Sequence, residues 1–333
     1  MNKLILHPHF DTTIQEISKL NIKLPNRPTN LIVDFDLYTY PPDGDVVLQL
    51  EDEPKFHTDP FKGYEYYKYL NKNICAYDES FQFFKSLEGD AYLTSHSLVL
   101  FYEKDYLPLN YLTFYFYTRS NIITNDTKFI CNTNDPETQS KIDYIEDRLE
   151  VLINNVPNNS LLFMDGPLIG KQMSSQTLEL SDKLFKKGII PIFFIKNSTS
   201  NLVINYIHSL KGKFNSDMHW SYTYLNNYER TCFFKYQDKI GNKAKVFCYI
   251  KSYDVSPQRV EFDVNIYRKY KRELNDIMNL IQYFILCQGD YKNPQIRPIA
   301  IAEKYARETI RLYDVYNIIK LYGIPTINQT RFG

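Results

Sequence analysis

Apolar and polar positions along the chain predict alternating strands and helices. Residues 30–40 (NLIVDFDLYTY) and 111–119 (YLTFYFYTR) alternate and are rich in β-branched and aromatic side chains, which is typical of strands. Residues 160–166 (SLLFMDG) and 188–197 (GIIPIFFIKN) are nearly unbroken apolar runs, as expected for strands in a sheet covered on both faces. A helical pattern over about 175–187 joins these two runs. Strand, helix, strand is the βαβ signature of an α/β protein.

A second amphipathic helix is predicted over residues 140–155. Ile142, Leu149 and Ile153 form one stripe at helical spacing, and Glu146 interrupts it. Burying an unpaired carboxylate is costly, so Glu146 on this face needs a lysine, a proton or a metal ion as a partner. The carboxylates expected on the opposite, solvated face are Asp143, Asp147 and Glu150.

The remaining pattern completes a mixed α/β sheet with helices on its faces. A hairpin is expected around Gly241 and Asn242, followed by a strand over 259–264 and by two long helices over about 264–287 and 298–321. No repeat and no Gly/Ser-rich linker divides the chain, which favours a single domain over residues 1–333. Its expected parts are core elements at about 28–40 and 110–264, an insertion at about 41–110 and C-terminal helices at about 264–322.

Composition narrows the functional classes. Lys and Arg together number 39, as do Asp and Glu, so no overall field draws the surface toward nucleic acid or membrane. The five cysteines form no C-x-x-C pair and are expected to be reduced thiols. No signal peptide and no long apolar run is found, which predicts a cytoplasmic protein without a membrane partner. The six histidines are scattered, and neither a zinc site nor a nucleophilic triad is indicated.

The most informative chemistry is carboxylates at strand ends. Asp34 follows an apolar strand, Asp165 ends another, and Glu146 lies on the helix that precedes the second strand. Three carboxylates that converge from such positions would form an oxygen-rich site suited to Mg²⁺ or Mn²⁺. Sites of this kind support two-metal phosphodiester cleavage. The structural alternatives are a turn-side Asp34, an Asp165 that caps the next helix, and a Glu146 paired with lysine.

Two further features qualify this interpretation. In LLFMDGPLIGKQ (161–172), only three residues separate Gly166 from Gly170, and Gln172 stands where a phosphate-binding loop needs a hydroxyl, so such a loop is not expected. Lys196 ends an apolar strand and could either neutralise a phosphate or reach solvent. A cluster of tyrosine and basic residues near the last helix suits a nucleic-acid backbone, and the alternative is a solvated loop. It comprises Tyr291, Lys292, Arg297 and Lys304.

The order of these segments resembles the NurA nuclease family over most of the chain. The segments that carry the resemblance are IVDFD (32–36), the helix with Glu146, LLFMDGPLIG (161–170), IIPIFFIKN (189–197), RVEF (259–262) and YKNPQIRPIAIAEKYARE (291–308). The resemblance implies a ribonuclease H-like core and a manganese-dependent DNA nuclease of end resection. It also implies a homodimer that docks on a HerA-type hexameric ATPase, the translocase.

The same resemblance implies roles for individual residues. Asp34, Glu146 and Asp165 match the family's metal ligands, Lys196 its strand-end lysine and Tyr291 the tyrosine of its final loop, with Arg297 as a further substrate contact. The family's first motif usually continues Asp-Gly-Ser, whereas this chain has Asp34-Phe35-Asp36, so Asp36 is a competing ligand. In the last motif, Ala302-Glu303 stands where an Ala-His pair is common, which adds negative charge and removes a neutral donor.

Two functional hypotheses follow. The first is a nuclease in which Asp34, Glu146 and Asp165 hold Mn²⁺ or Mg²⁺ and Lys196, Tyr291 and Arg297 position the phosphate. The second is a catalytically silent or weak subunit that caps a translocase ring, which the altered first and last motifs favour. A nuclease that acts on RNA is also compatible, because no feature of the sequence discriminates the sugar hydroxyl.

Overall fold

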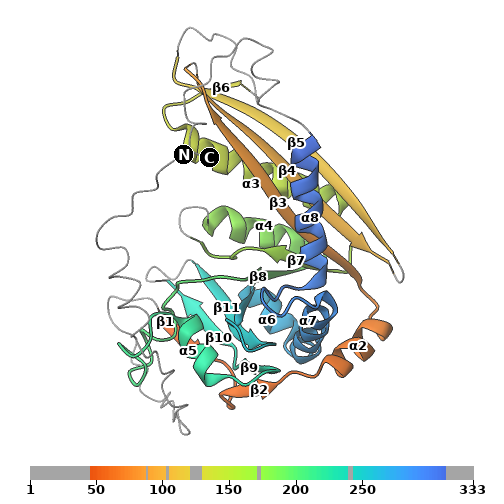
Figure 1. Ribbon diagram of the computed structural model, residues 1–333, viewed down its shortest axis with the longest axis vertical. Coiled ribbons are helices and arrows are strands. Elements are labelled where there is room, and N and C mark those ends of the chain that lie inside the picture. The colour runs from red at the N-terminus through yellow and green to blue at the C-terminus, as the bar shows by residue number, and fades with distance from the viewer. Residues whose placement is uncertain are drawn as a thin grey trace, which may run out of the picture.

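A computed structural model describes residues 46–312, apart from 88, 103–104, 121–129, 171–173 and 239–242. Its centre is one large mixed sheet with helices on both faces (Figure 1). The order of the main strands is β1-β10-β11-β12-β8-β7-β3-β4-β5-β6, with β2 and β9 attached through β11. The expected mixed α/β sheet flanked by helices, of the ribonuclease H-like kind, is confirmed.

The strands and the helices of the described residues have the following bounds. The strands are β1 (Val46–Gln49), β2 (Lys55–His57), β3 (Asn73–Lys85), β4 (Asp90–Phe101), β5 (Tyr106–Thr118), β6 (Ile130–Asn132), β7 (Ser160–Asp165), β8 (Ile190–Ile195), β9 (Glu229–Thr231), β10 (Phe234–Gln237), β11 (Ala244–Lys251) and β12 (Gln258–Phe262). The helices are α2 (Pro60–Tyr69), α3 (Pro136–Asn155), α4 (Ser174–Lys186), α5 (Asp217–Tyr224), α6 (Val264–Tyr270), α7 (Leu274–Gln288) and α8 (Arg297–Leu312). None of the described helices is long and apolar enough to cross a membrane.

Strand direction changes across the sheet. β3, β4 and β5 form an antiparallel meander, whereas β3, β7 and β8 run parallel. On the other side, β12 pairs antiparallel with β8 and leads to β11, β10 and β1. Figure 1 shows the long β3–β5 strands extending well beyond the helices that cover the middle of the sheet. Parallel neighbours bring their carboxyl ends to the same edge, so the ends of β7 and β8 lie together.

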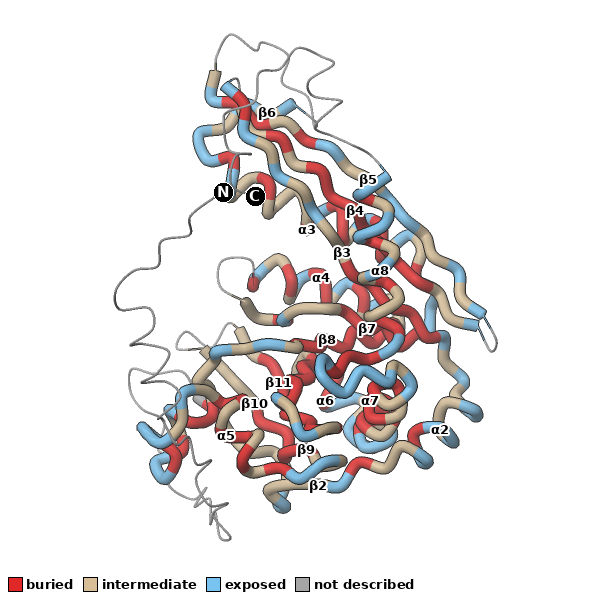
Figure 2. Tube along the Cα trace, viewed as in Figure 1, coloured by how far each residue is buried: buried red, intermediate tan, exposed pale blue. Residues whose placement is uncertain are grey.

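Side-chain alternation divides the core between the two faces of the sheet. On one face, Ile74, Phe163 and Ile192 pack with residues of α7 and α8. On the other face, Cys75 and Leu162 pack with residues of α3 and α4. A third cluster lies between α5 and β11. Figure 2 shows the buried residues concentrated where the helices cover the sheet.

Several boundaries differ from those expected. The stretch 41–110 is not an insertion, because it supplies β3 and β4 in the middle of the sheet. The long helix expected over 264–287 is two helices, α6 and α7, with a break at residues 271–273. The strand expected at 30–40, with Asp34 and Asp36, lies outside the described residues. The strand expected over 111–119 is the second half of a longer strand, β5.

Helix α3 forms where the periodicity predicts it, but it buries a different face. Asp135 caps its start by accepting a hydrogen bond from the Thr138 amide, and Pro136 occupies the first turn. Two residues expected to be solvated are engaged by β5: Tyr115 donates to Asp147, which is buried, and Tyr117 donates to Asp143.

Glu146, expected on the buried stripe of α3, is exposed. Its predicted burial is therefore wrong. Hydrophobic periodicity cannot reveal that two tyrosines of a neighbouring strand supply partners to the polar side of this helix.

Candidate catalytic edge of the sheet

The parallel register of β3 and β7 places two carboxylates side by side. Tyr77 pairs with Met164, and the next step along both strands brings Asp78 beside Asp165. Alternation places both on the face that carries α8, because Ala76 and Phe163, two residues earlier, belong to the core on that side. Neighbouring strands are about 4.8 Å apart, so the two carboxyl groups share one small volume. We call this place the catalytic edge, formed by Asp78, Asp165, Lys196 and Glu303.

Negative charge at this edge is incompletely balanced. Burial, followed by the charges of Glu79 and Asp165, raises the pKa of Asp78 to about 8. Burial also raises the pKa of Asp165, although Lys196 opposes the shift. Asp78 Oδ1 accepts the Glu79 amide at 2.9 Å, while Oδ2 has no hydrogen-bond partner among the described residues. A carboxylate pair in this state would be stabilised by a further cation.

Lys196 is the one cation that reaches the pair among the described residues. It follows β8, and its Nζ lies 3.2 Å from Asp165 and 2.9 Å from Glu303 on α8. Burial by itself would lower the pKa of Lys196, but these carboxylates outweigh it and raise the pKa. Glu303 also accepts a hydrogen bond from Gln295 at 2.9 Å and pairs with Arg307. Lys196 therefore joins the ends of two strands to the last helix.

Glu79 points to the opposite face of β3 and has a separate set of partners. Tyr144 of α3 donates to its carboxylate at 2.9 Å, and Arg148 forms an ion pair with it. The Arg148 guanidinium lies 4.7 Å from the ring centroid of Tyr144 and 5.5 Å from that of Tyr77. These contacts fix β3 to α3 directly behind Asp78.

The loop after β7 is held in place by a buried cluster of charged residues on β11 and β12. Gly166 has φ +94°, which glycine adopts without strain, so the chain turns immediately after Asp165. The Leu168 amide then donates to the buried carboxylate of Glu261 at 2.8 Å. Glu261 is paired with Lys245 at 2.5 Å and with Arg259 at 2.8 Å. This buried cluster of β11 and β12 holds the loop that carries Asp165.

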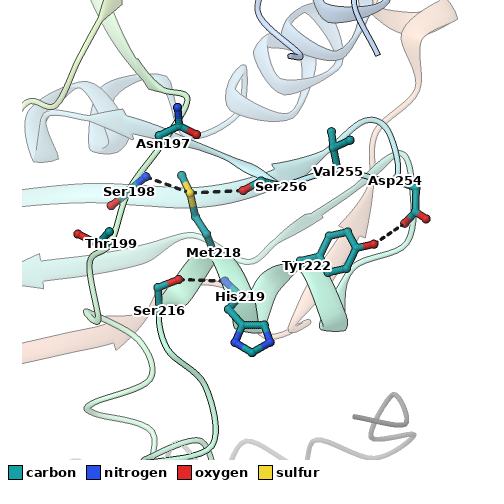
Figure 3. A pocket seen from close by; sticks show the side chains of 10 residues that line it. All are labelled: Asn197, Ser198, Thr199, Ser216, Met218, His219, Tyr222, Asp254, Val255 and Ser256. Carbon is teal, nitrogen blue, oxygen red and sulfur yellow. Dashed lines mark hydrogen bonds between the residues drawn. The ribbon is translucent and has the colours of Figure 1, made fainter. Parts of the chain in front are cut away.

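One cavity ends at the catalytic edge, and a second is lined by residues that follow Lys196 in the chain. The first, the α3 cavity, has a volume of about 790 Å³, lies between α3 and the extended β3–β5 strands, and ends at Asp78, Asp165 and Gly166. The second, the α5 cavity, has a volume of about 800 Å³ and begins with the residues that follow Lys196 (Figure 3). Its lining is Asn197, Ser198, Thr199, Ser216, Met218, His219, Tyr222, Asp254, Val255 and Ser256.

The donor chemistry of the catalytic edge fits a hard divalent cation. Asp78, Asp165 and Glu303 offer carboxylate oxygens, the ligands that Mg²⁺ and Mn²⁺ prefer. Burial raises the pKa of Asp78 most, and the neighbouring charges of Glu79 and Asp165 raise it further, so a bound cation would stabilise its ionised form. Within the described residues, no three acidic, histidine or cysteine side chains are already spaced as a ligand set. Lys196 bonds to two of the three carboxylates in this structure.

Comparison with known proteins now identifies the family. The NurA domain matches residues 45–321, which is most of the chain. The protein belongs to the NurA family. The comparison with curated proteins gives no match.

One solved NurA structure shares the fold of this chain at low sequence identity, and two further matches are more distant. The NurA nuclease from Sulfolobus solfataricus is 11% identical with a TM-score of 0.51, and the match covers 98% of this chain and 99% of that one. A NurA structure bound to dAMP and manganese is 9% identical with a TM-score of 0.37, covering 70% and 83%. Endonuclease V from Bacillus subtilis is 8% identical with a TM-score of 0.37, covering 76% and 91%.

The structure brings together only some of the residues predicted for a NurA site. Asp165 and Lys196 are in contact, and Glu303 joins them. Glu146 is exposed on α3 and does not line the α3 cavity. Asp34 and Asp36 lie outside the described residues, and the NurA match begins after both.

The predicted substrate contacts in the last loop lie at the surface. Tyr291 is 60% exposed and stacks only loosely with Lys292, whose Nζ is 5.8 Å from its ring centroid. Arg297 begins α8 and donates to the Cys287 carbonyl at 3.4 Å. Neither residue has a described contact with the carboxylates of the catalytic edge. Their roles in substrate binding stay predictions.

Sequence reasoning missed Asp78, and a usable signal was present. Residues 73–80 read NICAYDES, an apolar strand that ends in Asp78-Glu79-Ser80. This triplet keeps the first and third residues of the Asp-Gly-Ser pattern, which the resemblance places at Asp34. The strand lies within residues 41–110, which the sequence pattern predicts to be an insertion.

Proposed function

We propose that this protein is a divalent-metal-dependent nuclease that hydrolyses phosphodiester bonds in DNA. The observation that carries the proposal is the register of β3 and β7, which sets Asp78 beside Asp165 at one edge of the sheet. Membership of the NurA family supports it, as does the fold shared with a structure described as the NurA nuclease. Manganese is the metal named for a NurA structure, and Mn²⁺ or Mg²⁺ is the cofactor proposed here.

Asp78, Asp165 and Glu303 are the residues that would hold the metal, so Asp165 is kept from the set predicted from the sequence, and Asp78 and Glu303 stand in place of Asp34 and Glu146. When bound, a divalent cation activates water for attack and stabilises charge on the leaving oxygen. Glu79 stays with Arg148 and Tyr144 and supports β3 from behind. Its charge still reaches both aspartates, since it contributes to the raised pKa of each.

Lys196 would position the scissile phosphate. Its ammonium group lies against Asp165 and Glu303, and it would be available for a phosphate oxygen if these carboxylates held a metal. Its location at the end of a buried strand limits its freedom, which favours orientation of the substrate over loose attraction.

The cellular context is proposed from the family alone. We expect a cytoplasmic homodimer that works in DNA end processing with a HerA-type hexameric translocase. Co-purification of the two tagged proteins, together with the mass of each complex by light scattering, tests both associations. A monomer that does not bind the translocase would contradict this part.

Cleavage of linear DNA with purified protein tests the nuclease itself. Wild type should release nucleotides with Mn²⁺ and not with EDTA. Asp78→Asn and Asp165→Asn should each lower the rate on the order of a thousandfold, the scale seen when a group that stabilises the transition state is removed. Asn154→Asp, on an exposed site of α3, is the matched control.

Lack of cleavage by wild type, with or without the translocase, would contradict a nuclease and favour a silent ring-capping subunit. Cleavage that is retained in Asp165→Asn would show that the catalytic edge is not the active site. Parallel assays on RNA of the same sequence decide whether the activity is restricted to DNA.

A further inference from the structure

The α3 cavity and the α5 cavity differ in charge. The α3 cavity is lined by six carboxylates and three basic side chains, a formal balance of −3. The carboxylates are Asp78, Glu79, Asp90, Asp135, Glu137 and Asp165. The α5 cavity contains a single carboxylate, Asp254, and Lys251 pairs with it at 3.2 Å. A polyanion meets much less repulsion in the α5 cavity than in the α3 cavity away from the metal.

The α5 cavity presents neutral hydrogen-bonding groups. Hydroxyl and amide side chains from the segment after β8, from the start of α5 and from the loop before β12 share its wall (Figure 3). Met218 ties these segments together, because its sulfur accepts hydrogen bonds from the Ser198 amide and the Ser256 hydroxyl. Neutral hydroxyls and amides are common partners of phosphate and sugar oxygens.

His219 provides an oriented donor. Its Nδ1 accepts the Asn215 amide at 3.3 Å, so in the neutral ring the proton lies on Nε2. Nε2 has no partner among the described residues, and Figure 3 shows the ring projecting away from the strands. The wall behind Ser198 is fixed, because Arg259 donates to the Ser198 hydroxyl at 3.0 Å.

The lining of the α5 cavity begins next to the catalytic edge in the chain. Asn197, Ser198 and Thr199 directly follow Lys196. Three residues of extended chain span at most about 11 Å, so the cavity rim lies within a few nucleotides of a phosphate held by Lys196. The cavity volume of about 800 Å³ is within the roughly 300–1,000 Å³ that encloses a drug-sized ligand. A nucleotide or two fits such a space, whereas a duplex does not.

We propose that the α5 cavity binds nucleotides of an unpaired strand next to the scissile phosphate. This inference rests on the proposed nuclease function, since Lys196 sets the position of the strand. The strand passes from the catalytic edge over the end of β8, its phosphates contact the hydroxyl and amide groups, and His219 donates from Nε2.

Binding of fluorescein-labelled oligothymidylate, followed by anisotropy with EDTA present, tests the proposal without cleavage. Asn197 is exposed at the cavity rim, and Asn197→Glu adds a carboxylate where a phosphate should lie. It should weaken binding about fivefold, as a repulsion on the order of 1 kcal/mol requires. His219→Ala should weaken binding about threefold to tenfold through loss of one hydrogen bond.

Two matched controls make the same substitutions at exposed positions outside the α5 cavity. Asn154→Glu adds the same charge at an exposed site of α3, and His208→Ala removes an exposed imidazole that does not line the cavity. Both should bind like wild type. Equal affinities for Asn197→Glu and Asn154→Glu would overturn the proposal, whether or not the protein cleaves DNA. If Asn197→Glu and His219→Ala bind the oligonucleotide more weakly but the wild-type protein does not cleave DNA, the α5 cavity is a binding site. The proposed nuclease function would then be wrong.

Substrate length and pairing sharpen the test. With Mn²⁺, the factor by which Asn197→Glu raises KM should grow from a dinucleotide to a decanucleotide, because only the longer strand reaches the cavity. Affinity for a blunt duplex of equal length should fall by less than twofold in the same variant. A loss as large for duplex as for single strand would overturn the assignment to an unpaired strand.

Discussion

The catalytic edge and the cluster around Glu261 are two groups of buried charged residues on neighbouring strands. They differ in how far positive charge balances negative charge. At the catalytic edge, burial and adjacent carboxylates raise the pKa of Asp78 to about 8. In the cluster behind the β7 loop, Glu261 is completely buried, yet Lys245 and Arg259 outweigh the effect of burial and lower its pKa. Burial opposes ionisation in both places, and the partners decide the outcome.

The difference separates an acid that is satisfied within the fold from one that we propose binds a cation. Glu261 has two cations and a backbone amide, so its charge is satisfied within the fold. Asp78 accepts one backbone amide, and the nearby charges of Glu79 and Asp165 disfavour its ionised form, so a cation from outside the fold would stabilise it. Perturbed pKa values accompany both kinds of site, and only the direction with its cause discriminates them.

The largest effect is expected for Glu261→Gln. The substitution leaves Lys245 and Arg259 buried without a counter-charge, and breaking such a pair costs about 3–5 kcal/mol of unfolding free energy. Urea denaturation measures the loss. In Glu261→Gln/Lys245→Met, part of the lost stability should return, because one of the unpaired cations is removed. If Glu261→Gln alone were as stable as wild type, the Glu261 cluster would not differ from the catalytic edge in its contribution to stability.

Asp78→Asn should raise the free energy of unfolding, whereas Glu261→Gln lowers it, and the effect should depend strongly on pH. The carboxyl group has a pKa of about 8 when folded and about 3.9 when unfolded. Between these values the folded state holds the extra proton, so the stability of metal-free wild type should fall as pH rises through this window. Asp78→Asn should lack that slope and be the more stable protein at pH 8. Thermal unfolding across pH 4–8 with EDTA measures it, and parallel curves for both proteins would refute the raised pKa.

Lys196→Met should lower cleavage about tenfold to a hundredfold while Mn²⁺ binding is retained. The ammonium group now balances Asp165 and Glu303, and its loss leaves these carboxylates more dependent on the metal. Loss of an electrostatic contact to the phosphate accounts for the rate. Calorimetric titration with Mn²⁺ alongside steady-state kinetics separates the two effects. Weaker metal binding would mean that Lys196 organises the carboxylates instead of the substrate.

The smallest effect is expected for Glu146→Gln. This side chain is exposed on α3, and surface changes of this type usually stay within about 0.5 kcal/mol. Mn²⁺ affinity and cleavage should match wild type, whereas Glu303→Gln should weaken both. A loss in Glu146→Gln comparable to that in Glu303→Gln would restore the helical ligand that the sequence suggested.

Local pattern was enough to predict several elements and the positions of two residues that meet at the catalytic edge. The apolar runs that became β7 and β8 end at Asp165 and just before Lys196, and strand ends in a parallel sheet share an edge. The position of α3 also followed from its periodicity. Its buried face did not, because Tyr115 and Tyr117 reach it from a strand some thirty residues away in the chain.

The sequence by itself determined the class of sheet, its two central parallel strands and the acid and base at their ends, since these depend on alternation and on neighbours in the chain. Only the tertiary structure decided which carboxylates meet. The register of β3 against β7 selected Asp78, and the packing of α8 on that face added Glu303. Such pairings are set by contacts between segments about 90 to 140 residues apart, which no local pattern encodes.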